Sequence, residues 1–135
     1  MTDCVFCKIV DGDLPAYKIY EDGVCFAFLD INPVNRGHVL LIPKDHYRDL
    51  LGVPESIMLH LSSKVKFLAP KILLAVNAIA FNLIINNGTV AGQAVPHLHY
   101  HIIPRFEDDN LHHWPGKAVA DNDLLRLQAE IKSII

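Results

Sequence analysis

Three histidines alternate strictly with apolar residues in the run His97-Leu98-His99-Tyr100-His101. In a β-strand, side chains two residues apart point to the same face and lie roughly 6.5–7 Å apart. The run therefore predicts a strand with a row of imidazoles on one face, while Leu98, Tyr100 and Ile102 pack on the core from the other. Imidazole titrates near neutral pH, attacks phosphorus when neutral and steadies an oxyanion when protonated. We interpret the row as a reactive site, because chance polar residues on a solvent-facing strand would not repeat histidine three times.

A glycine-containing loop precedes the histidines by a few residues. It covers residues 86–93 and reads Asn-Asn-Gly-Thr-Val-Ala-Gly-Gln. Glycines and free backbone amides of this kind are suited to wrapping an anion. Together with the histidines, the loop predicts a site for a phosphate group.

The composition suits one globular domain. Of the 135 residues 51% are apolar, enough for a real core, and no repeat or linker divides them, so we predict a single domain over residues 1–135. The net charge of −3 argues against a broad cationic surface for nucleic acid. The most apolar stretch, residues 68–83, is broken by polar residues and proline, which argues against a membrane span. The odd count of three cysteines and the lack of an opening secretory signal favour a reducing cytoplasm.

The apolar pattern predicts short strands, one long helix in the middle and one short helix at the end. The strands are expected at Tyr17–Glu21, Val24–Leu29, His38–Ile42, Phe81–Ile85 and Pro96–Ile103, the last of them stopped by Pro104. The long helix begins near Pro54 and should kink or split at Pro70, and the short helix covers Asp123–Ile134. Because most strands follow one another through short turns, an α+β fold with an antiparallel sheet is favoured over a parallel one.

Cys4 and Cys7 are two residues apart, a spacing that lets two thiolates hold one metal ion. Two further ligands are needed, and His46 and His97 are the candidates. Four protein ligands close a zinc site, so the metal would be structural. The alternative is a pair of reduced, buried cysteines with His46 in solvent.

Two segments resemble one known family. Residues 92–105 read Gly-Gln-Ala-Val-Pro-His-Leu-His-Tyr-His-Ile-Ile-Pro-Arg and resemble the signature of the histidine-triad (HIT) superfamily, His-φ-His-φ-His-φ-φ with φ apolar. Residues 28–33, Phe-Leu-Asp-Ile-Asn-Pro, and 37–44, Gly-His-Val-Leu-Leu-Ile-Pro-Lys, match the family's earlier nucleoside-binding segment. The resemblance covers nearly the whole chain. It implies an antiparallel sheet of about five strands with one long and one short helix, and a homodimer with a continuous sheet.

The resemblance also implies roles for the triad. His99 is the expected nucleophile, which attacks the α-phosphate of a nucleotide and forms a nucleotidyl-histidine that water hydrolyses. His101 is expected to contact the phosphate and assist the leaving group, and His97 completes the catalytic group. By the same resemblance, zinc takes two cysteines, a downstream histidine and the first triad histidine, as in many bacterial members and in galactose-phosphate uridylyltransferases.

Further positions are expected to bind the nucleotide. Asp30 matches the position that binds the ribose hydroxyls and His38 the histidine behind the triad, while Asn86 and the amides near Gly92 should hold phosphate oxygens. The full expected set is Asp30, His38, Asn86, Gly92, Gln93, Ala94, His99 and His101.

The chain departs from the family pattern at Ala94, where many members carry a Ser or Thr hydroxyl that reaches the phosphate or leaving group. The expected activity is a nucleoside phosphoramidase of purine nucleotides, with a dinucleoside polyphosphate hydrolase as the alternative within the same chemistry. A nucleotide-binding adaptor or regulator with incidental catalysis is the alternative of another class. Arg105 is a candidate source of positive potential near the phosphate, and His112-His113-Trp114 either lines the pocket or forms a surface loop.

Overall fold

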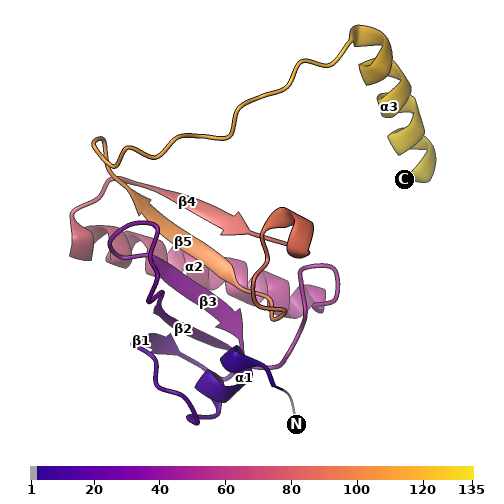
Figure 1. The fold of residues 1–135 in the computed structure, drawn as a ribbon. Coiled ribbons are helices and arrows are strands. Elements are labelled where there is room, and N and C mark those ends of the chain that lie inside the picture. The colour runs from indigo at the N-terminus through magenta and orange to yellow at the C-terminus, as the bar shows by residue number, and fades with distance from the viewer. Residues whose placement is uncertain (1–2) are drawn as a thin grey trace.

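The computed structural model describes residues 3–135 and is built on one antiparallel sheet. Its strands are β1 (Lys18–Glu21), β2 (Cys25–Leu29), β3 (Val39–Pro43), β4 (Ala80–Ile85) and β5 (Tyr100–Arg105). Their order across the sheet is β1-β2-β3-β5-β4, and every neighbouring pair is antiparallel (Figure 1). The predicted α+β fold with an antiparallel sheet is therefore confirmed.

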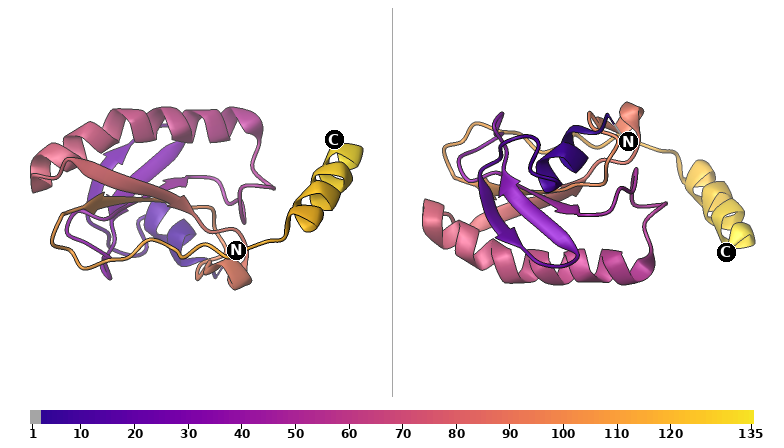
Figure 2. Two further views of the ribbon diagram at one scale, coloured as in Figure 1. Left: turned by 90° about the horizontal axis from the view of Figure 1, so that it is seen from above. Right: turned by 90° about the horizontal axis from the view of Figure 1, so that it is seen from below.

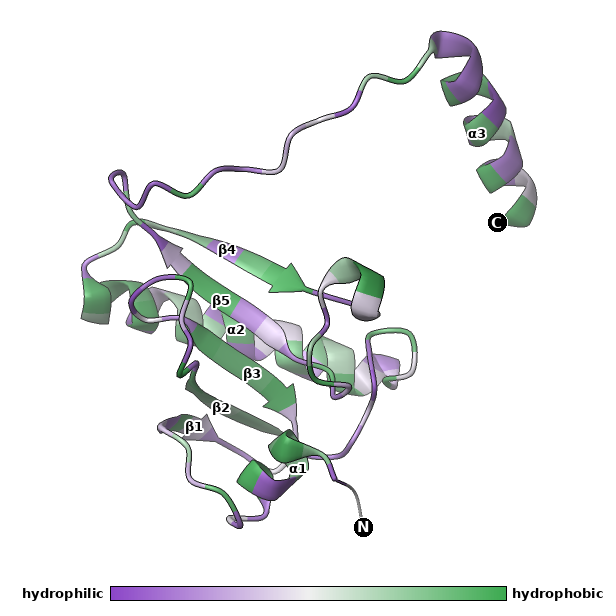
Figure 3. Cartoon of the chain, in the orientation of Figure 1, coloured by the Kyte–Doolittle hydropathy of each residue, from purple (hydrophilic) through white to green (hydrophobic). Residues whose placement is uncertain are grey.

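Helices cover the two faces of the sheet. The long helix α2 (Glu55–Val76) lies along one face, and the short helix α1 (Val5–Val10) lies on the opposite face (Figure 2). The α2 face buries a large core that includes Leu41, Leu61, Leu98, Tyr100 and Ile102. The α1 face buries a smaller cluster that consists of Phe6, Phe26, Phe28, Leu40 and Ile42. Because β2 and β3 are buried on both faces, nearly all of their residues are apolar (Figure 3).

The helix α2 runs through Pro70 without a break, so of the two predicted alternatives, a kink or a split, the split is wrong. Pro70 is exposed, whereas Leu68, Ala69 and Ile72 are buried around it. The apolar contacts of one face therefore continue past the proline, which lies on the exposed face of the helix. The helix ends at Asn77, which takes the left-handed conformation with φ of 58°.

The strand β5 is shifted relative to the sequence prediction of Pro96–Ile103, because it begins at Tyr100 and continues through Pro104 to Arg105. Its pairing with β3 ends at Ile102, whereas its pairing with β4 continues to Arg105. Pro104 therefore lies beyond the end of β3, and its carbonyl accepts a hydrogen bond from the side chain of Asn35 instead. A proline is tolerated at a strand position where no neighbouring strand needs its missing N–H.

Two short helices were not predicted, α1 and the 3₁₀ turn η1 (Thr89–Ala91), because neither is long enough to show an apolar period. The terminal helix α3 (Asp121–Ile134) has no buried residue and lies apart from the sheet at the end of an extended segment (Figure 1). The single domain over residues 1–135 stays a prediction. No helix within residues 3–135 is long and apolar enough to cross a membrane.

Candidate active site

The three histidines lie on the α1 face of the sheet. His101 is paired with Leu40 across β3 and β5, and the rings of His99 and His101 are 4.8 Å apart. Phe6 of α1 meets the ring of His99 edge to face at 5.2 Å and that of His97 at 5.8 Å. The alternation of the sequence thus sends the imidazoles to one face, although only His101 lies within β5 itself.

His97 is held as the tautomer that a metal ligand needs. Its Nε2 lies 2.9 Å from the carbonyl oxygen of Pro43, which can only accept a hydrogen bond, so Nε2 carries the proton. The lone pair of Nδ1 then faces Sγ of Cys4 at 3.4 Å and Sγ of Cys7 at 3.6 Å. Burial lowers the pKa of His97 to about 4, which keeps the ring neutral. A ligating histidine commonly donates its other N–H to a carbonyl in this way.

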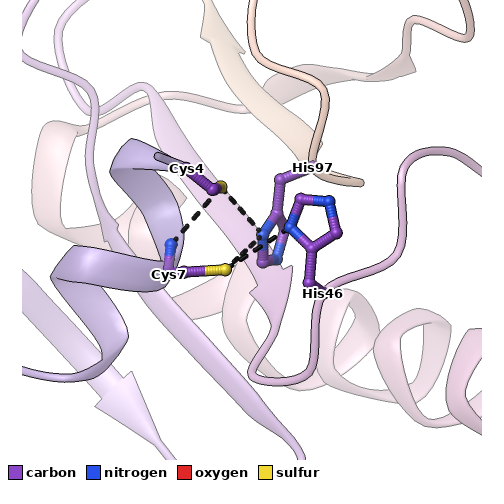
Figure 4. A group of neighbouring side chains, drawn as sticks. All are labelled: Cys4, Cys7, His46 and His97. Carbon is purple, nitrogen blue, oxygen red and sulfur yellow. Dashed lines mark hydrogen bonds between the residues drawn. The ribbon is translucent and has the colours of Figure 1, made fainter. Parts of the chain in front are cut away.

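The structure brings the four predicted metal ligands together. The ligand atoms of Cys4, Cys7, His46 and His97 all lie within 4.8 Å of one another, and their side chains converge in Figure 4. Cys4 caps the N-terminus of α1 and Cys7 lies in its first turn, so one short helix orients both thiols. Nδ1 of His46 is 3.4 Å from Sγ of Cys7. Two sulfurs and two imidazole nitrogens form a donor set that fits tetrahedral zinc.

A second group of candidate ligand atoms, on Asp22, Cys25 and His60, does not resemble a metal site. One carboxylate oxygen of Asp22 accepts the backbone N–H groups of Val24 and Cys25, and the other accepts the hydroxyl of Tyr20 and lies 2.8 Å from His60 Nε2. The carboxylate is therefore fully used in joining the β1–β2 turn to α2.

His99 presents a free lone pair. Its Nδ1 lies 2.7 Å from the backbone carbonyl oxygen of His97, which fixes the proton on Nδ1. Nε2 is then unprotonated in the neutral ring, and the side chain is 6% exposed. An oriented, neutral imidazole of this kind can act as a nucleophile without losing a proton first.

His38 and His101 form a hydrogen-bonded pair, and one backbone donor fixes which nitrogen of each ring carries the proton. The N–H of Val34 donates to Nδ1 of His38 at 3.0 Å, so the proton of neutral His38 lies on Nε2. That Nε2 lies 2.9 Å from Nδ1 of His101 and donates to it, which leaves the proton of His101 on its own Nε2. Burial, followed by the nearby rings of His99 and His38, lowers the pKa of His101 to about 4, and burial also lowers the pKa of His38.

Nε2 of His101 is the only buried side-chain nitrogen or oxygen within residues 3–135 that has no hydrogen-bond partner. A buried N–H without a partner is costly unless a ligand satisfies it. It lies on the same face as His99, and Oδ2 of Asp30 lies 3.6 Å from Nε2 of His38, beside the contact between His38 and His101. The arrangement combines a nucleophilic lone pair with an adjacent N–H donor.

The loop over residues 86–94 is held by Gln93. Its buried side-chain amide accepts from the backbone N–H of Gly88 at 2.8 Å and donates to the carbonyls of Arg48 and Val95. Its own backbone N–H donates to the carbonyl of Gly88. Gln93 therefore shapes the loop from within, and its expected contact with a ligand stays a prediction. Asn86 is half-buried, while Gly92 and Ala94 are exposed on the loop.

Arg105, a candidate source of positive potential, is paired within the protein. Its guanidinium donates to both carboxylate oxygens of Asp109, to Oδ1 of Asn82 and to the carbonyl of Leu111. Residues 111–114 line a cavity of about 440 Å³ together with Val34, Ile84 and Ile103, so this part of the tail lies next to the triad strand. The pairing of Arg105 with Asp109 had no signal in the sequence.

The comparisons with known proteins agree with this geometry. The chain belongs to the HIT domain family, whose model matches residues 11–108. The adenylylsulfatase HINT3 of Arabidopsis thaliana is 43% identical over 133 residues, which cover 98% of this chain but 66% of that relative, so this chain spans just under two thirds of its length. The adenosine 5'-monophosphoramidase hnt1 of Schizosaccharomyces pombe is 37% identical over 134 residues, or 98% of each chain.

Solved structures show the same fold. A protein from Streptococcus mutans has a TM-score of 0.91 and 39% identity, with 100% of this chain and 87% of that chain covered. A Zn-bound histidine triad family protein from Mycobacterium smegmatis has a TM-score of 0.78 and 37% identity, with 98% of each chain covered.

Proposed function

We propose that this protein is a nucleotide-binding hydrolase that cleaves purine nucleotide conjugates, nucleoside phosphoramidates first among them, at the α-phosphate. The observation that carries the proposal is the pairing of an unprotonated Nε2 on His99 with an unsatisfied N–H on the neighbouring His101. The names of the relatives, an adenosine monophosphoramidase and an adenylylsulfatase, support the same class of reaction.

In the proposed reaction, Nε2 of His99 attacks the α-phosphorus and the bond to the leaving group breaks, with its electron pair leaving on the amine nitrogen. The amine takes a proton from solvent, because Ala94 provides no hydroxyl and neutral His101 acts as a hydrogen-bond donor to a phosphoryl oxygen. Water then hydrolyses the nucleotidyl-histidine and restores His99. Asp30 is proposed to bind the ribose hydroxyls, and Asn86 with the backbone near Gly92 and Ala94 to hold the phosphate.

We also propose that Cys4, Cys7, His46 and His97 bind zinc. The donor set and its spacing support this, as does the Zn-bound relative from Mycobacterium smegmatis. With four protein ligands, zinc would be structural and would tie α1 to the segment that leads into His99. The test is the zinc content of protein purified without chelators, together with the melting temperature of Cys7→Ser. Metal-free protein with an unchanged melting temperature in the variant would refute the site.

We also propose a homodimer, on separate grounds. β4 is an edge strand, and its Phe81 and Leu83 are 38% and 45% exposed. An apolar edge strand is a ready template for pairing with another chain. The helix α3 also has no buried residue in a single copy. Light scattering on the purified protein tests the assembly, and a monomer at micromolar concentration would contradict it.

The decisive experiment compares wild type and His99→Ala on adenosine and guanosine phosphoramidates and on a dinucleoside polyphosphate. Release of nucleoside monophosphate by wild type alone is expected, and the relative rates identify the preferred base and the leaving group. Equal rates in both proteins would refute His99 as the nucleophile. The adaptor function is favoured by Ala94, which removes a donor near the leaving group. Tight nucleotide binding without turnover would support it.

A further inference from the structure

A buried polar cluster lies at the end of β5, outside the triad. The carboxylate of Asp109 is 5% exposed and accepts hydrogen bonds from Nε and Nη2 of Arg105 at 2.8 and 3.1 Å. It also accepts the backbone N–H groups of Phe106 and Leu111, each at 3.0 Å. The last donor is Nδ2 of Asn35, also at 3.0 Å. Hydrogen bonds from Arg105 first, and then from the backbone, hold the pKa of Asp109 far below its ordinary value, so it is an anion at neutral pH.

Asn35 is the donor that reaches this cluster from a distant part of the chain. The other donors to Asp109 lie between Arg105 and Leu111, whereas Asn35 belongs to the loop over residues 30–38. Its Nδ2 donates a second hydrogen bond to the carbonyl of Pro104 at 2.9 Å. One side-chain amide therefore ties the loop to the end of β5 at two points.

The same loop determines which ring nitrogens of His38 and His101 carry a proton. The backbone carbonyl of Asn35 accepts from the N–H of His38 at 3.1 Å, and the N–H of the preceding Val34 donates to Nδ1 of His38 at 3.0 Å. The Val34 bond places the proton of His38 on Nε2, from which it is donated to His101. Because hydrogen bonds weaken steeply when their angle departs from linear, a displaced loop would release this tautomer.

We propose that Asp109 and Asn35 are positioning residues of the nucleotide site: they hold the loop over residues 30–38 so that His38 donates to His101 and leaves its Nε2–H directed at the ligand. Asp30 begins the same loop and is held with it, since its backbone N–H donates to the carbonyl of His38 at 2.9 Å. The expected effect on catalysis rests on the proposed hydrolase function, whereas the tautomers of His38 and His101 do not depend on it.

The first test measures the tautomers of the His38 and His101 rings by ¹⁵N NMR, without any substrate. Protein labelled with ¹⁵N in histidine is expected to show a single Nε2–H tautomer for His38 and for His101. Asn35→Ala removes the tie but leaves Arg105 paired with Asp109, so the fold is retained while both rings become mixtures of tautomers. Asp123→Asn is the matched control, because it breaks an exposed ion pair with Arg126 in α3. Unchanged ring signals in both Asn35→Ala and Asp109→Asn would overturn the proposal.

The second test measures kcat and KM with a nucleoside phosphoramidate. Asn35→Ala and Asp109→Asn are each expected to lower kcat/KM roughly tenfold, the equivalent of one lost hydrogen bond, and the double variant no further. Asp123→Asn should match wild type. Losses that simply add, or single variants within about twofold of wild type, would refute the shared positioning role. If wild type itself shows no turnover, the proposed function is refuted. The ¹⁵N signals of His38 and His101 then still test whether Asn35 and Asp109 position the two rings.

Discussion

Replacing Gly37 with alanine tests how closely the loop over residues 30–38 is packed. Gly37 has φ of +86°, and a Cβ there would lie 2.7 Å from Cγ1 of Val76 and 3.2 Å from Cγ of Pro104. Val76 is β-branched and ends α2, so it has few other rotamers, and the ring of Pro104 cannot turn away. The contact must therefore be relieved by moving the loop or the helix end.

Two effects add in this substitution. The left-handed backbone costs an L-residue about 1–2 kcal/mol, and forcing a methyl group into a filled space costs about 1–3 kcal/mol more. We expect Gly37→Ala to lower the free energy of unfolding by about 2–5 kcal/mol. Gly12 has φ of +82° but no atom within 4 Å of an added Cβ, so in Gly12→Ala only the left-handed backbone is unfavourable.

The assay is urea unfolding followed by far-ultraviolet circular dichroism, with both variants compared at equal protein concentration. Gly37→Ala should unfold at a clearly lower urea concentration than Gly12→Ala, with a similar slope. Equal losses in the two variants would refute the reasoning, because they would show that the loop moves away from Val76 and Pro104 without resistance.

Three further outcomes follow from single side chains. Burial alone would raise the pKa of Asp22, but hydrogen bonds from two backbone N–H groups and two side chains outweigh it and hold the pKa below its ordinary 3.8. The stabilisation is present above pH 3.8 and is lost as the pH falls below it, so Asp22→Asn should flatten the stability loss measured by urea unfolding below about pH 4. Burial lowers the pKa of His101 from 6.5 to about 4, so stability should fall as the pH drops through this range, and His101→Gln should reduce the difference in urea midpoint across it. Ala94→Ser should raise phosphoramidate turnover roughly tenfold by restoring a donor, and an unchanged rate would show that the backbone N–H suffices.

Much of the site could be predicted because its signals are local. The alternation of His97, His99 and His101 follows the two-residue period of extended backbone, and the three side chains share a face although only His101 lies within β5. The spacing of Cys4 and Cys7 likewise follows from the reach of two thiols on one turn of chain. Both features depend only on neighbours in the sequence, and the structure places both as the pattern indicates.

Prolines show where local reasoning ends. Pro70 and Pro104 each remove a backbone donor, and the sequence therefore indicates a broken helix and a finished strand. Whether a missing donor matters depends on the surroundings: Pro70 is exposed to solvent, and Pro104 lies beyond the end of the β3 pairing. Those surroundings are a property of the tertiary structure.

The sequence by itself determined the class of fold, the face that carries the histidines and the residues able to bind a metal. Only the tertiary structure decided where the ring protons of His97 and His101 lie: the carbonyl of Pro43 fixes the proton of His97 on Nε2, and the N–H of Val34, acting through His38, fixes that of His101 on its Nε2. The tertiary structure also directs the side chain of Gln93 into the protein, where its amide donates to the carbonyl of Arg48. The physical reason is that a side-chain pattern repeats with the local backbone geometry, whereas the bonds from His97 to Pro43 and from His38 to His101 depend on the exact position of partners 54 and 63 residues away along the chain.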